Sequence, residues 1–254
     1  MKKNSLSYLI VFWVFTIMSN EVKAINVCDE EFKKLPEDDL VTSISMWKKL
    51  SLECSGTGIY EVRLAALYMD LGDYEKALPI IESGMELDSD YEKELLAILA
   101  SCYMGTRSFE QADEVVNKII LKYADWYRGY YLLSILKAHY GDFREALIAI
   151  NKANNLKEHP QYYSMMAYYF HRVEEHGYAA GAMAKAIDLD NNEIKRLLPV
   201  VATAYSFISL GRIERAEELL HYHQIAVPAS KNDPDFVKVI AYLRKKKAEG
   251  EVAD

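Results

Sequence analysis

Cysteine, proline and glycine are scarce in this sequence. Its 254 residues include 3 Cys, 6 Pro and 11 Gly. So few Pro and Gly exclude a collagen-like or disordered chain, and a hydrophobic content of 51% is that of a globular protein. Positively charged residues are outnumbered as well: the sequence has 30 Lys and Arg and 38 Asp and Glu, so its net charge is −8. Nucleic-acid-binding proteins usually carry a basic face, so we expect no nucleic-acid partner.

Sequence motifs for catalysis and metal binding are missing as well. The sequence has no CxxC, no GxSxG and no paired-carboxylate motif, and "SGTG" (55–58) lacks the lysine that a phosphate-binding loop requires. His171 and His176 are five residues apart, which does not place them on one helical face, and His221 and His223 point to different faces. We therefore predict no enzymatic activity, no cofactor and no metal site.

The first 24 residues have the parts of a secretory signal peptide. A positive start, "MKK", precedes an apolar run over 6–18, and Val22 and Ala24 form the small-residue pattern that signal peptidase reads. The alternative is an uncleaved membrane anchor, but this run is shorter than the ~20 residues that span a bilayer. Cleavage predicts a mature chain without membrane insertion. We expect it in the bacterial periplasm, with secretion as the second possibility.

The three cysteines are Cys28, Cys54 and Cys102. An exported chain meets an oxidising compartment, where disulfides form. Cys54 ends the apolar face of a helix predicted over 37–54, and Cys28 can reach the end of that helix if the chain doubles back. We therefore predict a Cys28–Cys54 disulfide. Cys102 falls inside another predicted helix and is expected to pack as a small buried hydrophobe.

One short pattern recurs along most of the chain. It aligns on an alanine that recurs at intervals of 35, 34, 33 and 37 residues: Ala77, Ala112, Ala146, Ala179 and Ala216. Twelve positions earlier each copy has a small residue: Ala65, Ala100, Ser134, Ala167 and Ala204. Three copies have a glycine seven positions after the first small residue, where the turn is expected: Gly72, Gly141 and Gly211. The small residues allow two antiparallel helices to approach closely, and glycine permits the tight turn between them.

Some copies depart from the pattern. Arg107 and Glu174 stand where the turn glycine is expected. Three residues after the first small residue the other copies have an aromatic residue (Tyr68, Tyr103, Phe170 and Phe207), whereas the copy that begins with Ser134 has Lys137. The copy over 160–192 fits worst, and its segment 172–186 leaves open a shift of the turn by one or two residues.

A period near 34 residues with this pattern resembles the tetratricopeptide repeat family. The resemblance covers roughly 58–230 and implies an all-α, right-handed superhelical solenoid of about five helix–turn–helix repeats. The predicted segments are a signal peptide over 1–24, an N-terminal capping region over 25–57, repeats over 58–92, 93–126, 127–159, 160–196 and 197–231, and a C-terminal capping helix and tail over 232–254. The terminal helices cover the apolar ends of the stack. We expect a single domain, because no Pro/Gly/Ser-rich linker divides the chain.

The resemblance also implies a function. In this family, the first helix of each pair lines a concave groove that holds a partner protein or peptide. The matching inward positions are Val62, Met69, Asp70, Glu94, Met104, Arg128, Tyr131, His139, Gln161, Ser164, Tyr168, His171, Arg172 and Tyr205. The later members of this set are aromatic and cationic, as interaction hot spots are. The alternative is that several of the tyrosines only pack between helices.

Two functional hypotheses follow from this resemblance. The first is a non-catalytic protein–protein interaction module, acting as an adaptor or assembly factor in the periplasm. The second is an immunity-type protein that sequesters a toxic effector in the same compartment, for which the acidic charge suits a basic partner. The sequence does not identify the partner.

Overall fold

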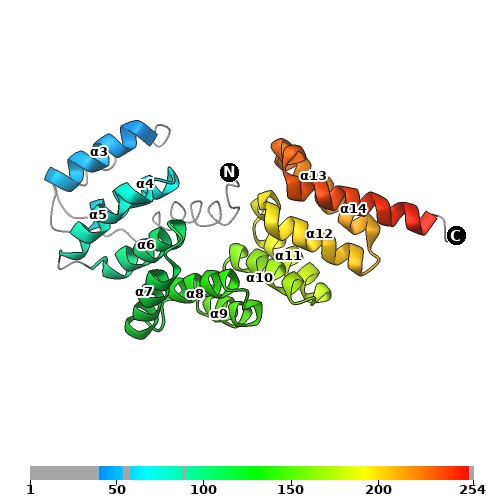
Figure 1. Cartoon of the computed structure of the whole chain (residues 1–254), viewed down its shortest axis with the longest axis horizontal. Coiled ribbons are helices and arrows are strands. Elements are labelled where there is room, and N and C mark those ends of the chain that lie inside the picture. The colour runs from blue at the N-terminus through cyan, green and yellow to red at the C-terminus, as the bar shows by residue number, and fades with distance from the viewer. Residues whose placement is uncertain (1–39, 54–57, 88–89, 252–254) are drawn as a thin grey trace. The chain divides into compact units, whose positions relative to one another are not determined.

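A computed structural model of the chain describes residues 40–53, 58–87 and 90–251. These residues form twelve α-helices and two 3₁₀ helices, and no strand occurs among them (Figure 1). The all-α class and the succession of helix–turn–helix pairs predicted from the sequence are thereby confirmed. The predicted signal peptide, Cys28 and Cys54 lie outside the described residues. None of the described helices is long and apolar enough to cross a membrane.

The contacts between helices divide the chain into two compact units, where the sequence predicted a single domain. The first unit ends at Ala124 and the second runs from Asp125 to Asp254. The division has a physical reason: in a repeat protein each repeat contacts only its neighbours, so few contacts cross a repeat boundary.

The first unit consists of one helix followed by two pairs. Its helices are α3 (Leu40–Glu53), α4 (Ile59–Asp70), α5 (Tyr74–Met85), α6 (Glu92–Gly105) and α7 (Phe109–Lys122). Trp47 and Leu50 of α3 are buried in one apolar cluster with Tyr60 and Leu64 of α4. The Trp47 and Tyr60 ring centroids lie 6.2 Å apart. This contact covers the apolar face of α4, as expected of a terminal helix.

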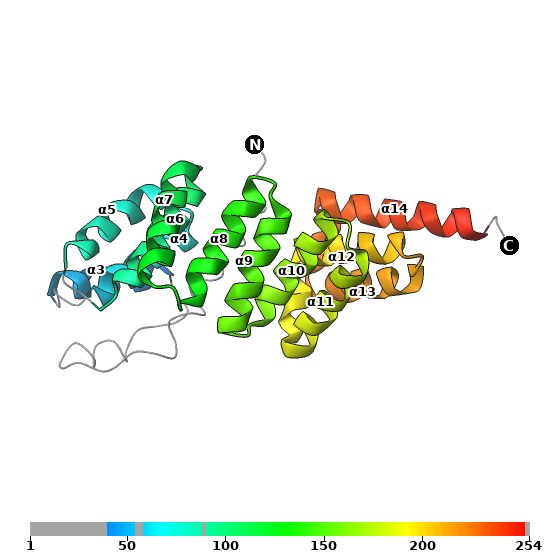
Figure 2. The same ribbon diagram turned by 90° about the horizontal axis from the view of Figure 1, so that it is seen from below.

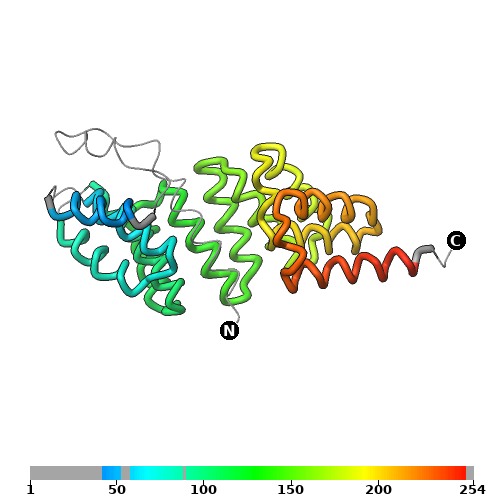
Figure 3. The backbone as a smooth tube through the Cα atoms, turned by 90° about the horizontal axis from the view of Figure 1, so that it is seen from above, coloured from blue at the N-terminus to red at the C-terminus, as the bar shows by residue number. Residues whose placement is uncertain are grey.

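The second unit consists of three pairs and a final helix. Its helices are α8 (Tyr127–His139), α9 (Phe143–Leu156), α10 (Pro160–Arg172), α11 (His176–Leu189), α12 (Leu197–Ser209), α13 (Ile213–Ala226) and α14 (Pro234–Glu251), with 3₁₀ helices η1 (Asn191–Lys195) and η2 (Pro228–Asn232). Helices α8 to α11 lie side by side in chain order (Figure 2). Helix α14 runs beside α12 and α13 (Figure 3).

Helix α14 begins as the sequence predicted. The Asp233 carboxylate accepts hydrogen bonds from the backbone N–H of Asp235 (2.8 Å) and of Phe236 (3.3 Å), which caps the helix at Pro234. Phe236 and Val239 are buried in the same apolar cluster as Leu219 and Leu220 of α13. The cap therefore closes the core of the last pair.

The repeated small residues lie where the helices of each pair meet. All ten have no exposed surface: Ala65, Ala77, Ala100, Ala112, Ser134, Ala146, Ala167, Ala179, Ala204 and Ala216. Close packing of two helices leaves no room for a longer side chain at these positions, because protein interiors have few voids. Cys102 is also fully buried and free, and burial raises the pKa of its thiol to about 12.

All five turns within the pairs have the same backbone conformation. The second residue after the first helix has a positive φ in each turn: Gly72 (74°), Arg107 (65°), Gly141 (87°), Glu174 (63°) and Gly211 (70°). The next residue donates its N–H to a carbonyl five positions back, for example Asp142 to Lys137 and Glu175 to Phe170 (2.8 and 2.9 Å). This is the hydrogen bond of a helix C-terminus that ends in a left-handed residue. The turn of the fourth pair is therefore not shifted, and Arg107 and Glu174 adopt the glycine conformation.

Replacing Arg107 or Glu174 by glycine is expected to stabilise the protein. A non-glycine residue in the left-handed region costs roughly 1–2 kcal/mol, and the greater freedom of glycine in the unfolded chain removes part of that gain. We expect a net increase of about 1 kcal/mol in the free energy of unfolding for each variant, measured by urea denaturation. Gly141→Ala is the converse change, and it should lower the free energy of unfolding by a similar amount. A loss of stability in both glycine variants would show that these turns carry no such strain.

Candidate functional site

The predicted groove residues of the first unit are mostly enclosed. Met69 of α4 and Met104 of α6 are buried, so they offer a partner little surface. Asp70 and Glu94 are half-buried. Burial raises the pKa of the Asp70 carboxyl to about 7. In this unit the predicted acidic positions are the accessible ones and the methionines pack inside.

In the second unit the predicted residues separate into two groups at opposite ends of the first helices. Tyr131, Gln161 and Ser164 lie in the first half of α8 or α10, and Arg128 lies in the first turn of α8. Tyr168, His171, Arg172 and Tyr205 lie in the second half of α10 or α12, and His139 is the exposed last residue of α8. The two groups differ in burial and in chemistry.

The first group belongs to what we call the buried polar cluster: Tyr131, Gln161, Ser164, Glu193 and Arg196. The Gln161 amide Nε2 donates to the Tyr131 hydroxyl at 2.7 Å. The Ser164 hydroxyl donates to the Glu193 carboxylate, which also forms an ion pair with Arg196. Tyr131, Gln161, Ser164 and Glu193 are almost completely buried. These side chains therefore connect α8, α10 and η1, and they present almost no surface to a partner.

Arg128 is also buried, beside two aromatic rings. Its guanidinium carbon lies 5.5 Å from the Trp126 ring centroid and 5.6 Å from that of Tyr127. At such distances the ring faces attract the cation. Arg128 and Arg172 lie at opposite ends of the first helices, and Arg128 is buried whereas Arg172 is exposed.

The second group forms what we call the aromatic wall: Tyr168, His171, Arg172 and Tyr205, together with Phe143 and Tyr242. Arg172 is exposed, and its guanidinium carbon lies 4.1 Å from the Phe143 ring centroid. Its Nη1 donates to the Tyr168 hydroxyl at 3.0 Å. Phe143 and Tyr168 meet edge to face, with ring centroids 6.1 Å apart. The Arg172 side chain is thereby held in one orientation at the surface, with its remaining N–H groups free to donate.

The aromatic wall continues from α10 to α12 and α14 through stacked rings. The His171 ring is stacked on the Tyr205 ring, with centroids 6.0 Å apart and an interplanar angle of 21°. Tyr205 in turn lies 5.5 Å from Tyr242 of α14. His171 and Tyr205 are half-buried, so each has one side in the protein and one side open. Rings that are fixed by stacking lose little conformational entropy when a partner covers them.

The sequence reasoning missed two members of the wall. The repeat pattern assigned no groove position to Phe143, and Tyr242 was predicted only as part of the capping helix over 232–254. The signal for Phe143 was its place at the start of a second helix, directly after the turn, where it can reach the first helix of the next pair. Nothing in the repeat pattern assigns an inward register to α14, so Tyr242 had no such signal.

His171 and His176 are close in space, although their five-residue spacing does not place them on one face of a single helix. They belong to different helices, α10 and α11, and the turn brings their ring centroids to 5.8 Å. The Nδ1 atoms of His171 and His176 lie 3.0 and 3.3 Å from the Ser206 hydroxyl oxygen. That hydroxyl donates to the Ala202 carbonyl at 3.0 Å, so both imidazoles can donate to the oxygen.

The Ser206 hydroxyl oxygen is thus within hydrogen-bond distance of two imidazoles and of one backbone carbonyl, and it links α12 to α10 and α11. Among the described residues, no group of three or more His, Cys, Asp or Glu side chains could hold a metal ion. His223, in the other predicted pair, is buried with Nδ1 2.6 Å from the Ile194 carbonyl, whereas His221 is exposed. The pair does not share a face, as the sequence indicated.

Acidification is expected to destabilise the second unit through His171. Burial, together with the nearby His176 and Arg172, lowers the pKa of His171 to about 4, and Glu174 opposes this shift. An unfolded histidine titrates near 6.5, so between about pH 6.5 and 4 the unfolded chain binds more protons and stability falls as the pH falls. Solvent reaches this ring, so we expect a loss on the order of 1 kcal/mol.

The variant His171→Gln isolates this effect, because glutamine can still donate to Ser206 but does not titrate. Urea unfolding at pH 7 and pH 4.5 should show a smaller loss of stability for the variant than for the wild type. His159 and His223, whose pKa values burial also lowers, are present in both proteins and cancel from the comparison. An equal loss in the two proteins would contradict the assignment.

Comparisons with known proteins agree with this geometry. Residues 62–91, which include most of α4 and all of α5, match the family model described as a tetratricopeptide repeat. No curated protein matches the sequence. The chain is similar to YrrB, described as a TPR protein with an unusual peptide-binding site, with a TM-score of 0.52 and 15% identity over 77% of this chain and 97% of that one. The fold is that of the tetratricopeptide repeat proteins.

Two larger structures have the same fold. The APC/C hetero-tetramer Cut9-Hcn1 gives a TM-score of 0.75, with 14% identity over 94% of this chain and 46% of that chain. Yeast Tom70 gives a TM-score of 0.64, with 14% identity over 96% of this chain and 47% of that chain. The chain therefore spans less than half the length of either protein. Tetratricopeptide repeat proteins generally mediate protein–protein interactions and are generally non-catalytic scaffolds, and their solenoids present extended binding surfaces.

Proposed function

We propose that this protein is a non-catalytic adaptor or assembly factor that binds a partner protein or peptide on the aromatic wall. The observation that carries the proposal is the exposure of Arg172 and the partial exposure of Tyr168 and Tyr205 on neighbouring first helices. Tyr and Arg side chains dominate the energetics of protein interfaces when they lie on a rigid surface. The relatives support this class of function, since one is described by its peptide-binding site and another as a hetero-tetramer.

The polar character of the wall indicates how the partner is held. The Arg172 guanidinium keeps N–H donors that its bond to Tyr168 does not use, and a carboxylate or backbone carbonyl of the partner would accept from them. The rings of Tyr205 and Tyr242 offer apolar area beside this donor. We therefore expect a segment with an acidic or carbonyl group next to an apolar side chain.

We propose the bacterial periplasm as the place where this binding occurs. The support is the signal-peptide pattern of residues 1–24. A full-length protein with a C-terminal tag should appear as a shorter species in the periplasmic fraction. A full-length product in the cytoplasm would contradict the proposal.

The binding function is tested by capture from that compartment. The same tagged protein is isolated from the periplasmic fraction after mild cross-linking, and its partners are identified by mass spectrometry. We expect one protein at near-stoichiometric yield from the wild type and its loss from a Tyr168→Ala, Arg172→Ala double variant. Equal yields from both would place the contact elsewhere on the protein.

A further inference from the structure

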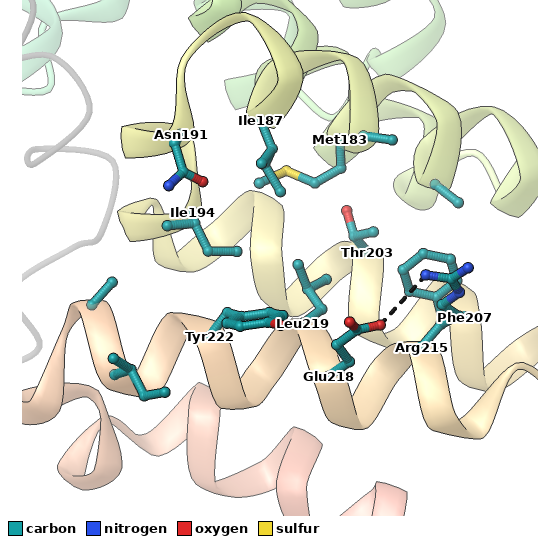
Figure 4. A pocket seen from close by; sticks show the side chains of 14 residues that line it. Met183, Ile187, Asn191, Ile194, Thr203, Phe207, Arg215, Glu218, Leu219 and Tyr222 are labelled. Atoms are coloured by element: carbon teal, nitrogen blue, oxygen red, sulfur yellow. Dashed lines mark hydrogen bonds and ion pairs between the residues drawn. The ribbon is translucent and has the colours of Figure 1, made fainter.

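A cavity of about 550 Å³ opens within the second unit, away from the aromatic wall (Figure 4). Its two sides are faces of the second helices α11 and α13, and α12 contributes Thr203 and Phe207 to its floor. Met183 and Ile187 line one side, and Leu219 lies on the other. Most of the lining is apolar.

The longest interval between repeats lies at this cavity. Ala179 and Ala216 are 37 residues apart, and the additional residues form η1 between α11 and α12. The corresponding link between α9 and α10 is only residues 157–159. Ile194 of η1 contributes to the lining at one end. The η1 insertion thus borders one end of the cavity.

One polar group lies at the floor of the cavity without a partner. Thr203 has no exposed surface, and its Oγ1 makes no hydrogen bond with any described residue. Figure 4 shows this side chain pointing into the space between Met183 and Leu219. A buried hydroxyl without a partner costs free energy, which a hydrogen bond from a ligand would recover.

The size and the charge of the cavity restrict its ligand. Small-molecule pockets are typically about 300–1,000 Å³, largely apolar, with a few placed polar groups. Arg215 and Glu218 at the rim form an ion pair at 3.4 Å, so they cancel each other and favour neither an anion nor a cation. Tyr222 and Ile225 at the mouth are 54% and 63% exposed, so they leave apolar surface that a ligand would cover.

We propose that this cavity binds a small, uncharged, largely apolar molecule that carries one hydrogen-bonding group, which Thr203 recognises. Binding replaces on the order of 18 waters, at ~30 Å³ each, that the cavity would otherwise hold against apolar walls. The ligand's polar group pairs with the Thr203 hydroxyl, and its apolar body packs between α11 and α13. This site does not depend on the protein-binding role of the aromatic wall.

A matched pair of probes tests the proposal on the full-length protein. 1-Naphthol has an apolar body with one hydroxyl, and naphthalene lacks that hydroxyl. The wild type should bind 1-naphthol about three- to tenfold more tightly than naphthalene, measured by fluorescence titration. Thr203→Val should lose this preference while it keeps or raises the melting temperature of the unliganded protein, because it removes an unsatisfied hydroxyl. A Thr203→Val variant that keeps the preference would overturn the proposal.

A second variant tests the place of binding. Ala184 is exposed and lines the cavity, so Ala184→Trp should fill the space and reduce the affinity for both probes at least tenfold. Lys185→Trp, at the adjacent exposed position outside the lining, is the control and should bind as the wild type does. Failure of the wild type to bind either probe would overturn the proposal. In that case the capture experiment is repeated with Ala184→Trp. Loss of the captured partner from this variant would show that the cavity is a protein-docking groove instead.

Discussion

Replacing Arg196 by alanine is expected to lower the free energy of unfolding of the second unit by about 3 kcal/mol. Glu193 is only 3% exposed and forms an ion pair with Arg196, while Ser164 donates the other hydrogen bond to its carboxylate. Removing the arginine leaves a buried carboxylate without a compensating charge. Such a loss costs far more than the pair itself contributes, because the remaining charge keeps its full desolvation penalty.

A rescue variant shows whether the buried charge is the cause. Glu193→Gln in the Arg196→Ala background removes the charge but keeps the shape, so it should recover most of the lost stability. The matched control is Arg215→Ala, whose partner Glu218 is exposed, and it should cost about 0.5 kcal/mol or less. Urea denaturation followed by circular dichroism gives all of these values. A decrease of less than about 1 kcal/mol in the free energy of unfolding for Arg196→Ala would show that the buried polar cluster does not stabilise the fold.

Changing Tyr168 and Arg172 together to alanine is expected to weaken partner binding at least tenfold. Truncating one hot-spot Tyr or Arg costs on the order of 2 kcal/mol or more, and ~1.4 kcal/mol is one decade of affinity. The two side chains also hold each other through the 3.0 Å hydrogen bond, so either single change should already disturb both. The affinity is measured by titration with the captured partner.

The matched control uses the same residue types on the second helices. Arg144 of α9 and Tyr178 of α11 are exposed, and their joint change to alanine should leave binding unchanged. Helicity should persist in both double variants, because the fully buried Ala167 and Tyr169 of α10 are untouched. If the control variant lost more affinity for the partner than the Tyr168→Ala, Arg172→Ala variant, the partner would bind the second helices instead.

The repeat architecture was predictable because it rests on local signals. The alternation of small residues sets how closely two helices approach, and every one of these residues is buried as expected. Glycine marks three of the five turns. Arg107 and Glu174 take the same conformation without that signal because the hydrogen bonds of the turn fix the backbone more strongly than the residue type does.

The site was less predictable because its contacts depend on elements outside the repeat. Glu193, which helps to enclose Ser164, comes from η1, and no repeat position predicts it. The inward register could not show how far neighbouring elements cover Tyr131, which is buried. His171 and His176 met across a turn, where helical spacing does not apply.

Site-specific cross-linking at Tyr205 tests the central claim most directly. A photoreactive benzoylphenylalanine replaces Tyr205 in the full-length protein, and a second version carries it at Tyr178, the exposed tyrosine of α11. After illumination in cells, the partner should be covalently attached through position 205 and not through position 178. Attachment through position 178 alone would contradict binding at the aromatic wall.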